Sequence, residues 1–274
     1  MQSLVELPTN DIIGYAEHFA GPHLDMVVAS IAEGNTAAQL WQIEHDAGLS
    51  FLLWDKGNNV LYLAGAPLAE AAIGGLAELF ETFIRPRTLA AGRPYFKARA
   101  IAPHNERCLP DLFRGVALRE APTLFFSLPG DTTLPTNALE GIQFVPIDRS
   151  LLGGDFANRE PVVEEIGSMW PSLDRFFERA FGCAALEGAR LVCWCTAEYL
   201  SSERCGIGIA TEPAYQRRGI ASATAARFCQ MARERGIDPY WECGTWNGAS
   251  VRVAEKVGFA RVAEERYWIG SLDA

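Results

Sequence analysis

The sequence lacks several features that would assign it to a particular class of protein. No run of about 18 apolar residues occurs, so no membrane-spanning helix is predicted. No basic segment followed by an apolar one opens the chain, which argues against a signal peptide. The 24 Lys and Arg are outnumbered by 34 Asp and Glu, and no basic stripe indicates nucleic-acid binding. We therefore expect a cytoplasmic protein with neither a membrane nor a nucleic acid as partner.

Metal-ligand spacing is also missing. The four histidines show no ligand pattern, and the pair Cys193 and Cys195 has no second Cys or His pair that would complete a zinc site. Buried, reduced thiols are the expected state of the seven cysteines in a cytoplasmic protein. We therefore expect no metal.

The length and composition indicate two domains. The chain has 274 residues, of which 49% are hydrophobic, which is enough for more than one sizeable core. A stretch rich in Pro, Gly, Thr and Asn follows Leu128 and interrupts the periodic pattern. We predict an N-terminal domain over residues 1–128, a linker over 129–140 and a C-terminal domain over 141–274.

The most informative segment is Gln216-Arg-Arg-Gly-Ile-Ala221. It follows an apolar run, residues 204–211, that predicts a strand, and it opens a predicted helix over residues 222–235. A strand, a tight turn and a helix N-terminus gather backbone N–H groups and partial positive charge, which favours an anion. Arg217 and Arg218 add formal charge for phosphate oxygens, and Gly219 lets a ligand approach the backbone closely.

The segments around this turn carry a family resemblance. A strand is predicted over residues 239–243, and the pattern Asn247-x-x-Ser250 then leads into a helix that ends at Gly258-Phe259. With Gln216, Gly219 and Ala221 in the turn, residues from 142 onward resemble the GCN5-related N-acetyltransferases, the GNAT superfamily. An ordinary βαβ unit with a basic turn does not explain this continuation. The resemblance implies an α/β fold with a mixed sheet.

The N-terminal half reads as a degenerate copy of the same layout. The segment Arg93-Pro-Tyr-Phe-Lys-Ala98 mirrors Asp238-Pro-Tyr-Trp-Glu-Cys243, and Asn105 mirrors Asn247. The basic turn has no counterpart, since residues 68–75 contain no Lys or Arg. This layout resembles a GNAT subgroup with an N-terminal GNAT-like extension. We expect two tandem GNAT-like domains, the first of which binds no coenzyme and instead shapes the acceptor cleft, packs as an interdomain wall or forms a homodimer.

The resemblance also implies a cosubstrate and its binding residues. Family members bind acetyl-CoA through the basic turn and the preceding strand, which splays to admit the pantetheine arm. The residues expected to bind it are Ile209, Ala210, Thr211, Gln216, Arg217, Arg218, Gly219, Ile220, Ala221, Ser222 and Asn247.

The catalytic residues are less directly indicated. Many relatives carry a Glu on the strand before the turn and a Tyr in the later helix, where this sequence has Gly206 and Ala254. Proton transfer then falls to Glu198, Glu242 or Ser250. A solvated strand-end carboxylate or a locally bonded helix-start serine is the structural alternative for these three, and Asn247 is also an N-cap candidate.

The function that the resemblance implies is acetyl transfer from acetyl-CoA to the amine of a small molecule, by direct attack in a ternary complex. Two alternatives remain open at this point. One is a coenzyme A-binding module without turnover, and the other is acetylation of protein N-termini or lysines.

Overall fold

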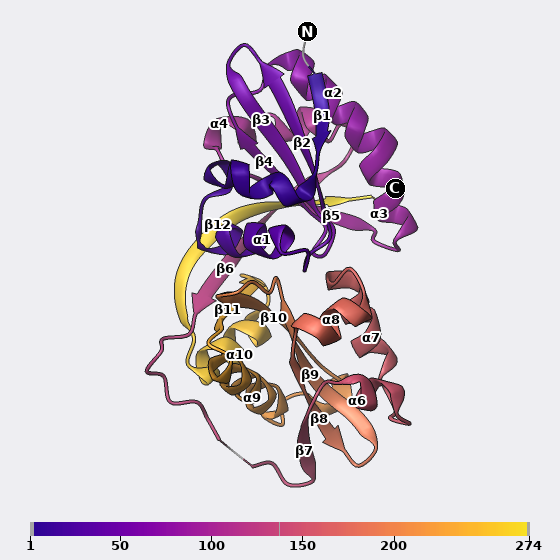
Figure 1. The fold of residues 1–274 in the computed structure, drawn as a ribbon, viewed down its shortest axis with the longest axis vertical. Helices are drawn as coiled ribbons and strands as arrows, with labels where there is room; N and C mark the ends of the chain where they lie inside the picture. The colour runs from indigo at the N-terminus through magenta and orange to yellow at the C-terminus, as the bar shows by residue number, and fades with distance from the viewer. Residues whose placement is uncertain (1–2, 137, 273–274) are drawn as a thin grey trace. The chain divides into compact units, whose positions relative to one another are not determined.

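The computed structural model describes residues 3–136 and 138–272, which form two compact units. Unit 1 holds the chain up to Pro122 together with the residues from Arg266 onward, and unit 2 holds Thr123–Glu265 (Figure 1). Two strands, β6 (Leu118–Ser127) and β12 (Ala260–Ser271), have residues in both units.

Unit 1 is built on a mixed sheet in which β1 to β5 are neighbours in chain order, and the end of β12 pairs with β5. The strand pairs are antiparallel except β4 with β5. Its core includes Phe80, Phe96 and Phe113, whose ring centroids lie 4.6–4.9 Å apart. Its elements before β6 are β1 (Ser3–Leu7), η1 (Thr9–Phe19), α1 (Pro22–Ala32), β2 (Ala38–His45), β3 (Gly48–Asp55), β4 (Val60–Gly65), α2 (Glu70–Leu79), η2 (Phe80–Ile84), α3 (Arg85–Ala90), β5 (Tyr95–Ala100), α4 (Pro103–Glu106) and α5 (Leu109–Leu112).

Unit 2 repeats this plan. Its sheet runs β11-β10-β9-β8-β7, and the end of β6 pairs with β11. Again the pairs are antiparallel except one, β10 with β11. Its elements before β12 are β7 (Ile142–Pro146), α6 (Arg149–Gly153), α7 (Glu160–Met169), α8 (Leu173–Arg179), β8 (Gly182–Glu187), β9 (Arg190–Glu198), β10 (Arg204–Thr211), η3 (Pro213–Tyr215), α9 (Ile220–Glu234), β11 (Asp238–Gly244) and α10 (Gly248–Val257).

Helices α7 and α9 cover opposite faces of the unit 2 sheet. Successive side chains on a strand point to opposite faces. On β9, Cys193 interacts with Thr224 of α9, whereas Trp194 and Thr196 contact α7. The basic turn over residues 216–221 therefore lies on the α9 side, and α7 packs on the other face of the sheet.

The expected tandem arrangement of two similar units is present, since the strand order and the position of the single parallel pair agree in both. The placement of the unit boundary differs from the predicted division into residues 1–128, 129–140 and 141–274. Residues 123–127 of β6 belong to unit 2 because they pair with β11, from Tyr240↔Ser127 to Gly244↔Thr123. The end of β12 belongs to unit 1 because Trp268↔Ala98 and the next three pairs join it to β5.

The predicted linker also lies inside unit 2 and is not a connection between units. Arg233 of α9 donates hydrogen bonds to the backbone carbonyls of Thr132 (2.7 Å) and Pro129 (3.0 Å), which fix the first part of this segment on the helix. Asn137 lies outside the described residues.

Several expectations drawn from composition can be compared with the structure directly. All seven cysteines are free and buried, as predicted. Within residues 3–136 and 138–272, no three His, Cys, Asp or Glu side chains gather as metal ligands would. None of the helices in the described part of the chain combines the length and apolar character that crossing a bilayer requires.

Candidate functional site

The centre of unit 2 is the point where β10 and β11 diverge. The two parallel strands pair at three positions, ending at Gly206↔Tyr240. Beyond this point β10 continues to Thr211 paired with β9, and β11 continues to Gly244 paired with β6. The backbone of residues 207–211 therefore faces an opening, as the resemblance implied for this strand.

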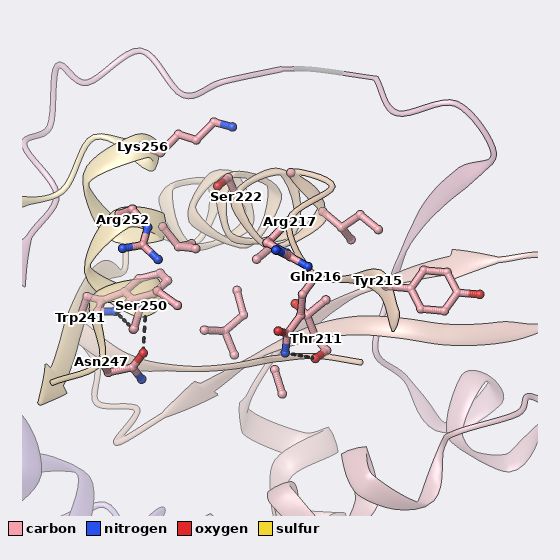
Figure 2. A pocket seen from close by; sticks show the side chains of 17 residues that line it. Thr211, Tyr215, Gln216, Arg217, Ser222, Trp241, Asn247, Ser250, Arg252 and Lys256 are labelled. Atoms are coloured by element: carbon pink, nitrogen blue, oxygen red, sulfur yellow. Dashed lines mark hydrogen bonds between the residues drawn. The ribbon is translucent and has the colours of Figure 1, made fainter. Parts of the chain in front are cut away.

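A pocket of about 410 Å³ lies along this opening (Figure 2). Strands β10 and β11, the turn before α9, the first turn of α9 and one face of α10 along its length form its walls. Its lining residues are Ile209, Ala210, Thr211, Tyr215, Gln216, Arg217, Gly219, Ile220, Ala221, Ser222, Trp241, Asn247, Ala249, Ser250, Arg252, Val253 and Lys256.

The turn exposes the N-terminus of α9 to this pocket. Gly219 has a left-handed backbone conformation (φ 81°) and has no side chain that would cap the first N–H groups of the helix. Arg217 is also left-handed (φ 63°), which is unfavourable for a residue with a Cβ and is found most often at functional sites. A helix of 15 residues directs its positive dipole end here.

Three cationic side chains surround the same space. Arg217 comes from the turn, and Arg252 and Lys256 come from successive turns of α10, on the face that lines the pocket (Figure 2). The Lys256 ammonium lies 4.0 Å from the point that a Cβ on Gly219 would occupy. The pocket therefore combines formal positive charge with free helix N–H groups, which is the environment of a phosphate site.

The start of α10 is fixed by a short chain of hydrogen bonds (Figure 2). Asn247 caps the helix, since its Oδ1 accepts from the Ser250 backbone N–H at 3.1 Å. The Ser250 hydroxyl in turn accepts from Trp241 Nε1 at 3.0 Å. Asn247 thus has the capping role that was the structural alternative for it, and it lines the pocket as well.

Of the eleven residues expected to bind the cosubstrate, ten line this pocket, and Arg218 does not. The Arg218 side chain donates to Glu187 Oε1 at 3.0 Å and its guanidinium lies 5.0 Å from the centre of the Tyr215 ring. The sequence analysis missed Arg252 and Lys256. Their i, i+4 spacing on the helix after Asn247 is the signal that indicates a shared face.

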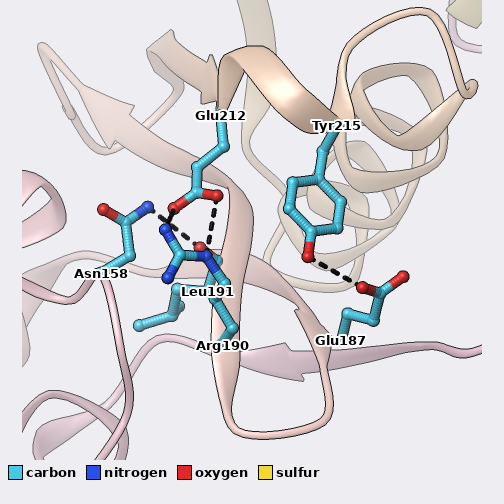
Figure 3. A network of polar contacts seen from close by, with 6 residues as sticks. All are labelled: Asn158, Glu187, Arg190, Leu191, Glu212 and Tyr215. Carbon is cyan, nitrogen blue, oxygen red and sulfur yellow. Dashed lines mark hydrogen bonds and ion pairs between the residues drawn. The ribbon is translucent and has the colours of Figure 1, made fainter.

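A network of polar contacts holds the turn against the β8–β9 hairpin (Figure 3). Glu212 accepts two hydrogen bonds from Arg190, at 2.6 and 2.9 Å, and the Tyr215 hydroxyl donates to Glu187 at 2.8 Å. The hydrogen bonds from Tyr215 and then Arg218 lower the pKa of the Glu187 carboxyl. These contacts fix both ends of the segment that precedes α9.

The three residues proposed for proton transfer are placed on both sides of the sheet. Ser250 lines the pocket. Glu198 is the register partner of Gly206, so its side chain shares the opposite face with Gly206 and Gly208. Glu242 is two residues beyond Tyr240, the β11 partner of Gly206, and therefore lies on that same face across the opening.

Comparison with known proteins agrees with this geometry. The family model described as GNAT acetyltransferase matches residues 132–267. The uncharacterised N-acetyltransferase YdfB of Bacillus subtilis is 33% identical over 125 residues, which is 46% of this chain and 47% of that protein. The chain therefore matches about half the length of this curated relative.

Solved structures match over nearly the whole chain. A GCN5-related N-acetyltransferase-like protein from Streptococcus suis has a TM-score of 0.66 at 17% identity, covering 95% of this chain and 98% of that one. A tandem GNAT protein from the clavulanic acid biosynthesis pathway has a TM-score of 0.56 at 12% identity, covering 100% and 99%. The chain has the GNAT fold in two tandem units, and residues 132–267, about half of its length, match the GNAT acetyltransferase family model.

Proposed function

We propose that this chain is an acetyl-CoA-dependent N-acetyltransferase that transfers an acetyl group to the amine of a small molecule by direct attack in a ternary complex. The observation that carries the proposal is the pocket between the diverging strands, where the N-terminus of α9 meets three cationic side chains.

The residues present fit coenzyme A. The α9 N-terminus with Arg217, Arg252 and Lys256 would hold the pyrophosphate, and Gly219 leaves its backbone accessible. The backbone of β10 from Ile209 to Thr211 would hold the pantetheine arm, because the divergence of β11 leaves this edge of the strand open. Bound here, acetyl-CoA would supply an acyl thioester, which an amine can attack without a metal.

The chemistry then requires two contributions from the protein. A backbone N–H on the edge of β10 from which β11 has diverged would donate to the oxygen that becomes negative in the transition state. A carboxylate would take the proton that the attacking amine loses, and Glu198, whose Oε1 lies beside Gly208 of β10, is the candidate carboxylate that was expected from the sequence. At the place where relatives carry a tyrosine acid this chain has Ala254, which cannot donate a proton, so we assign water as the proton donor for the thiolate.

Unit 1 is proposed to bind no coenzyme. Its β4 and β5 stay paired where β10 and β11 diverge, through Leu63↔Ala100, and Ile101 N–H still bonds to Leu63 O at 2.8 Å. Asn105, the counterpart of Asn247, is fully buried and bonds to the backbone of Ala66 and Leu68. The corresponding space is therefore occupied by the chain itself. We place the enzyme in the cytoplasm because all seven of its cysteines are free thiols.

The proposal is tested with acetyl-CoA and a panel of small primary amines. Acetyl-CoA should raise the melting temperature, and at least one amine should stimulate release of free coenzyme A thiol. Stabilisation without thiol release from any amine would indicate a coenzyme-binding module instead. Thiol release only with peptides bearing a free N-terminus or lysine would indicate a protein acetyltransferase.

A further inference from the structure

Two carboxylates converge on a strand position that has no side chain. A Cβ placed on Gly208 of β10 would lie 2.9 Å from Glu165 Oε1, and Glu198 Oε1 would be closer still. Glu198 comes from the end of β9, and Glu165 comes from α7 on the same side of the sheet. The absence of a side chain at Gly208 is therefore what allows both carboxylates to reach this part of β10.

Glu165 is held in this position by two donors. Trp194 Nε1 donates to its Oε2 at 2.8 Å, and the Thr196 hydroxyl donates to its Oε1 at 3.1 Å. Burial raises the pKa of the Glu165 carboxyl, and these two hydrogen bonds offset only part of that effect. Half-buried carboxylates whose pKa is shifted by desolvation and that are held by specific partners cluster at functional sites.

The coenzyme pocket connects this position to the reaction. Gly208 immediately precedes Ile209, the first pocket-lining residue of β10, and lies in the part of the strand from which β11 has diverged. The pocket lies on the α9 side and the carboxylates on the α7 side of the same opening. An acceptor approaching from the α7 side would therefore meet both carboxylates next to the β10 backbone.

The other groups facing this side suit a cation. Glu242 lies across the opening on β11. The Trp246 side chain, which is 57% exposed, lies against Gly244 at the end of the same strand. An exposed indole on the same face of a strand as a carboxylate provides cation–π and ion-pair contacts, by which ammonium groups are bound.

We propose that Glu165 and Glu198 bind the ammonium group of the acceptor beside Gly208, and that Glu165 accepts the proton which the amine must lose before it attacks. This inference rests on the proposed function and extends it in two ways. It names a cationic amine as the class of acceptor, and it assigns the base to a residue of α7 instead of the strand-end Glu198.

The step balances as follows. The ammonium transfers one proton to Glu165, and the neutral nitrogen forms a bond to the thioester carbonyl carbon. The C–S bond breaks, the thiolate takes a proton from water, and a second proton is lost from the nitrogen as the amide forms. Glu165 returns its proton to solvent, so the net products are an acetamide, a thiol and one proton.

Glu165→Gln, with Glu164→Gln as the matched control, tests the assignment. Glu164 is the neighbouring residue on α7 and is exposed. With a primary alkylamine that the wild type acetylates, kcat of Glu165→Gln should fall by roughly 10²–10⁴-fold, and its rising limb against pH should be lost. The coenzyme pocket of the variant should be intact. Its affinity for acetyl-CoA, measured by calorimetry, should equal that of the wild type, and acetyl-CoA should raise its melting temperature. Wild-type kcat in Glu165→Gln would overturn the assignment.

A binding experiment separates this inference from the proposed function. Propylamine is titrated into the wild type, Glu165→Gln and Glu198→Gln without acetyl-CoA. Binding that is weakened in both variants supports the acceptor site even if the wild type shows no turnover, in which case only the proposed function fails. Binding that is equal in all three proteins, or absent from the wild type together with absent turnover, refutes the site.

Discussion

Two adjacent arginines in the turn before α9 should contribute very differently to coenzyme binding. Arg217 lines the pocket, whereas the neighbouring Arg218 bonds to Glu187. Replacing Arg217 by alanine removes one cation beside the α9 N-terminus. The hydrogen bonds that hold the turn do not involve the Arg217 side chain, so they remain in the variant. A hydrogen bond to a charged group is worth about 1.5–3 kcal/mol, so the dissociation constant for acetyl-CoA should rise by roughly 10- to 150-fold.

The assay is isothermal titration calorimetry of acetyl-CoA at two salt concentrations. Arg217→Ala and Lys256→Ala should each weaken binding, and the loss should shrink at higher salt because screening weakens the phosphate contacts of the wild type. Arg218→Ala is the matched control from the adjacent position, and its affinity should stay near that of the wild type. If Arg218→Ala lost as much affinity as Arg217→Ala, the directions that the structure gives these two side chains would be wrong.

Three further predictions follow from the titratable groups. The hydrogen bond from Tyr215 keeps the pKa of Glu187 below that of a free carboxyl. The ionised Glu187 therefore stabilises the fold above the ordinary carboxyl pKa, and this effect is lost as the pH falls through the lowered value. Glu187→Gln should lower the melting temperature at pH 7, and the difference from the wild type should vanish in acid. Burial raises the pKa of Glu165, so ionisation of this carboxyl opposes folding as the pH rises through the raised value. Glu165→Gln should melt at a higher temperature than the wild type at pH 8 but not at about pH 4. A difference in melting temperature that is the same at both pH values would contradict the assignment. Burial raises the pKa of Cys183 and Cys229 to about 12, so a thiol reagent should label the native protein slowly and the denatured protein at all seven cysteines.

The turn and its strand and helix could be predicted from sequence because their determinants are local. Gly219 needs no distant contact to adopt a left-handed conformation, and the dipole of α9 follows from the helix itself. The strand predicted over residues 204–211 agrees with β10 at both ends. The direction of Arg218 was not predictable, because it depends on Glu187, 31 residues earlier in the chain.

The carboxylate from α7 could not be identified from any local pattern. Glu165 bonds to Trp194 and Thr196 because α7 packs against the face of β9 to which these two side chains point. The bonded residues are 29 and 31 positions apart in the sequence. The sequence did contain one relevant signal, the glycines at 206 and 208. Gly206 was interpreted as the loss of a catalytic side chain, and no role was assigned to Gly208, whereas the structure shows that Gly208 leaves room for two carboxylates supplied by other elements.

The unit boundary was not predictable either, because it depends on pairing between strands that are far apart in the sequence. A stretch rich in Pro and Gly is typical of linkers, but it does not indicate which strands pair beyond it. The pairing of Trp268 with Ala98 joins residues 170 positions apart, and no periodicity in either segment specifies the partner.

This long-range pairing has a consequence for how the protein is made. As the ribosome synthesises the chain from its N-terminus, β5 emerges long before residues 268–271, with which it pairs in the finished structure. During that interval the edge of β5 has unpaired backbone groups, which are a known cause of association between nascent chains. Unit 1 therefore completes its sheet only after unit 2 has been translated, and a chain that stops before Trp268 leaves β5 open. The half of the chain that contains unit 2 is thus followed by the strand that completes the sheet of unit 1.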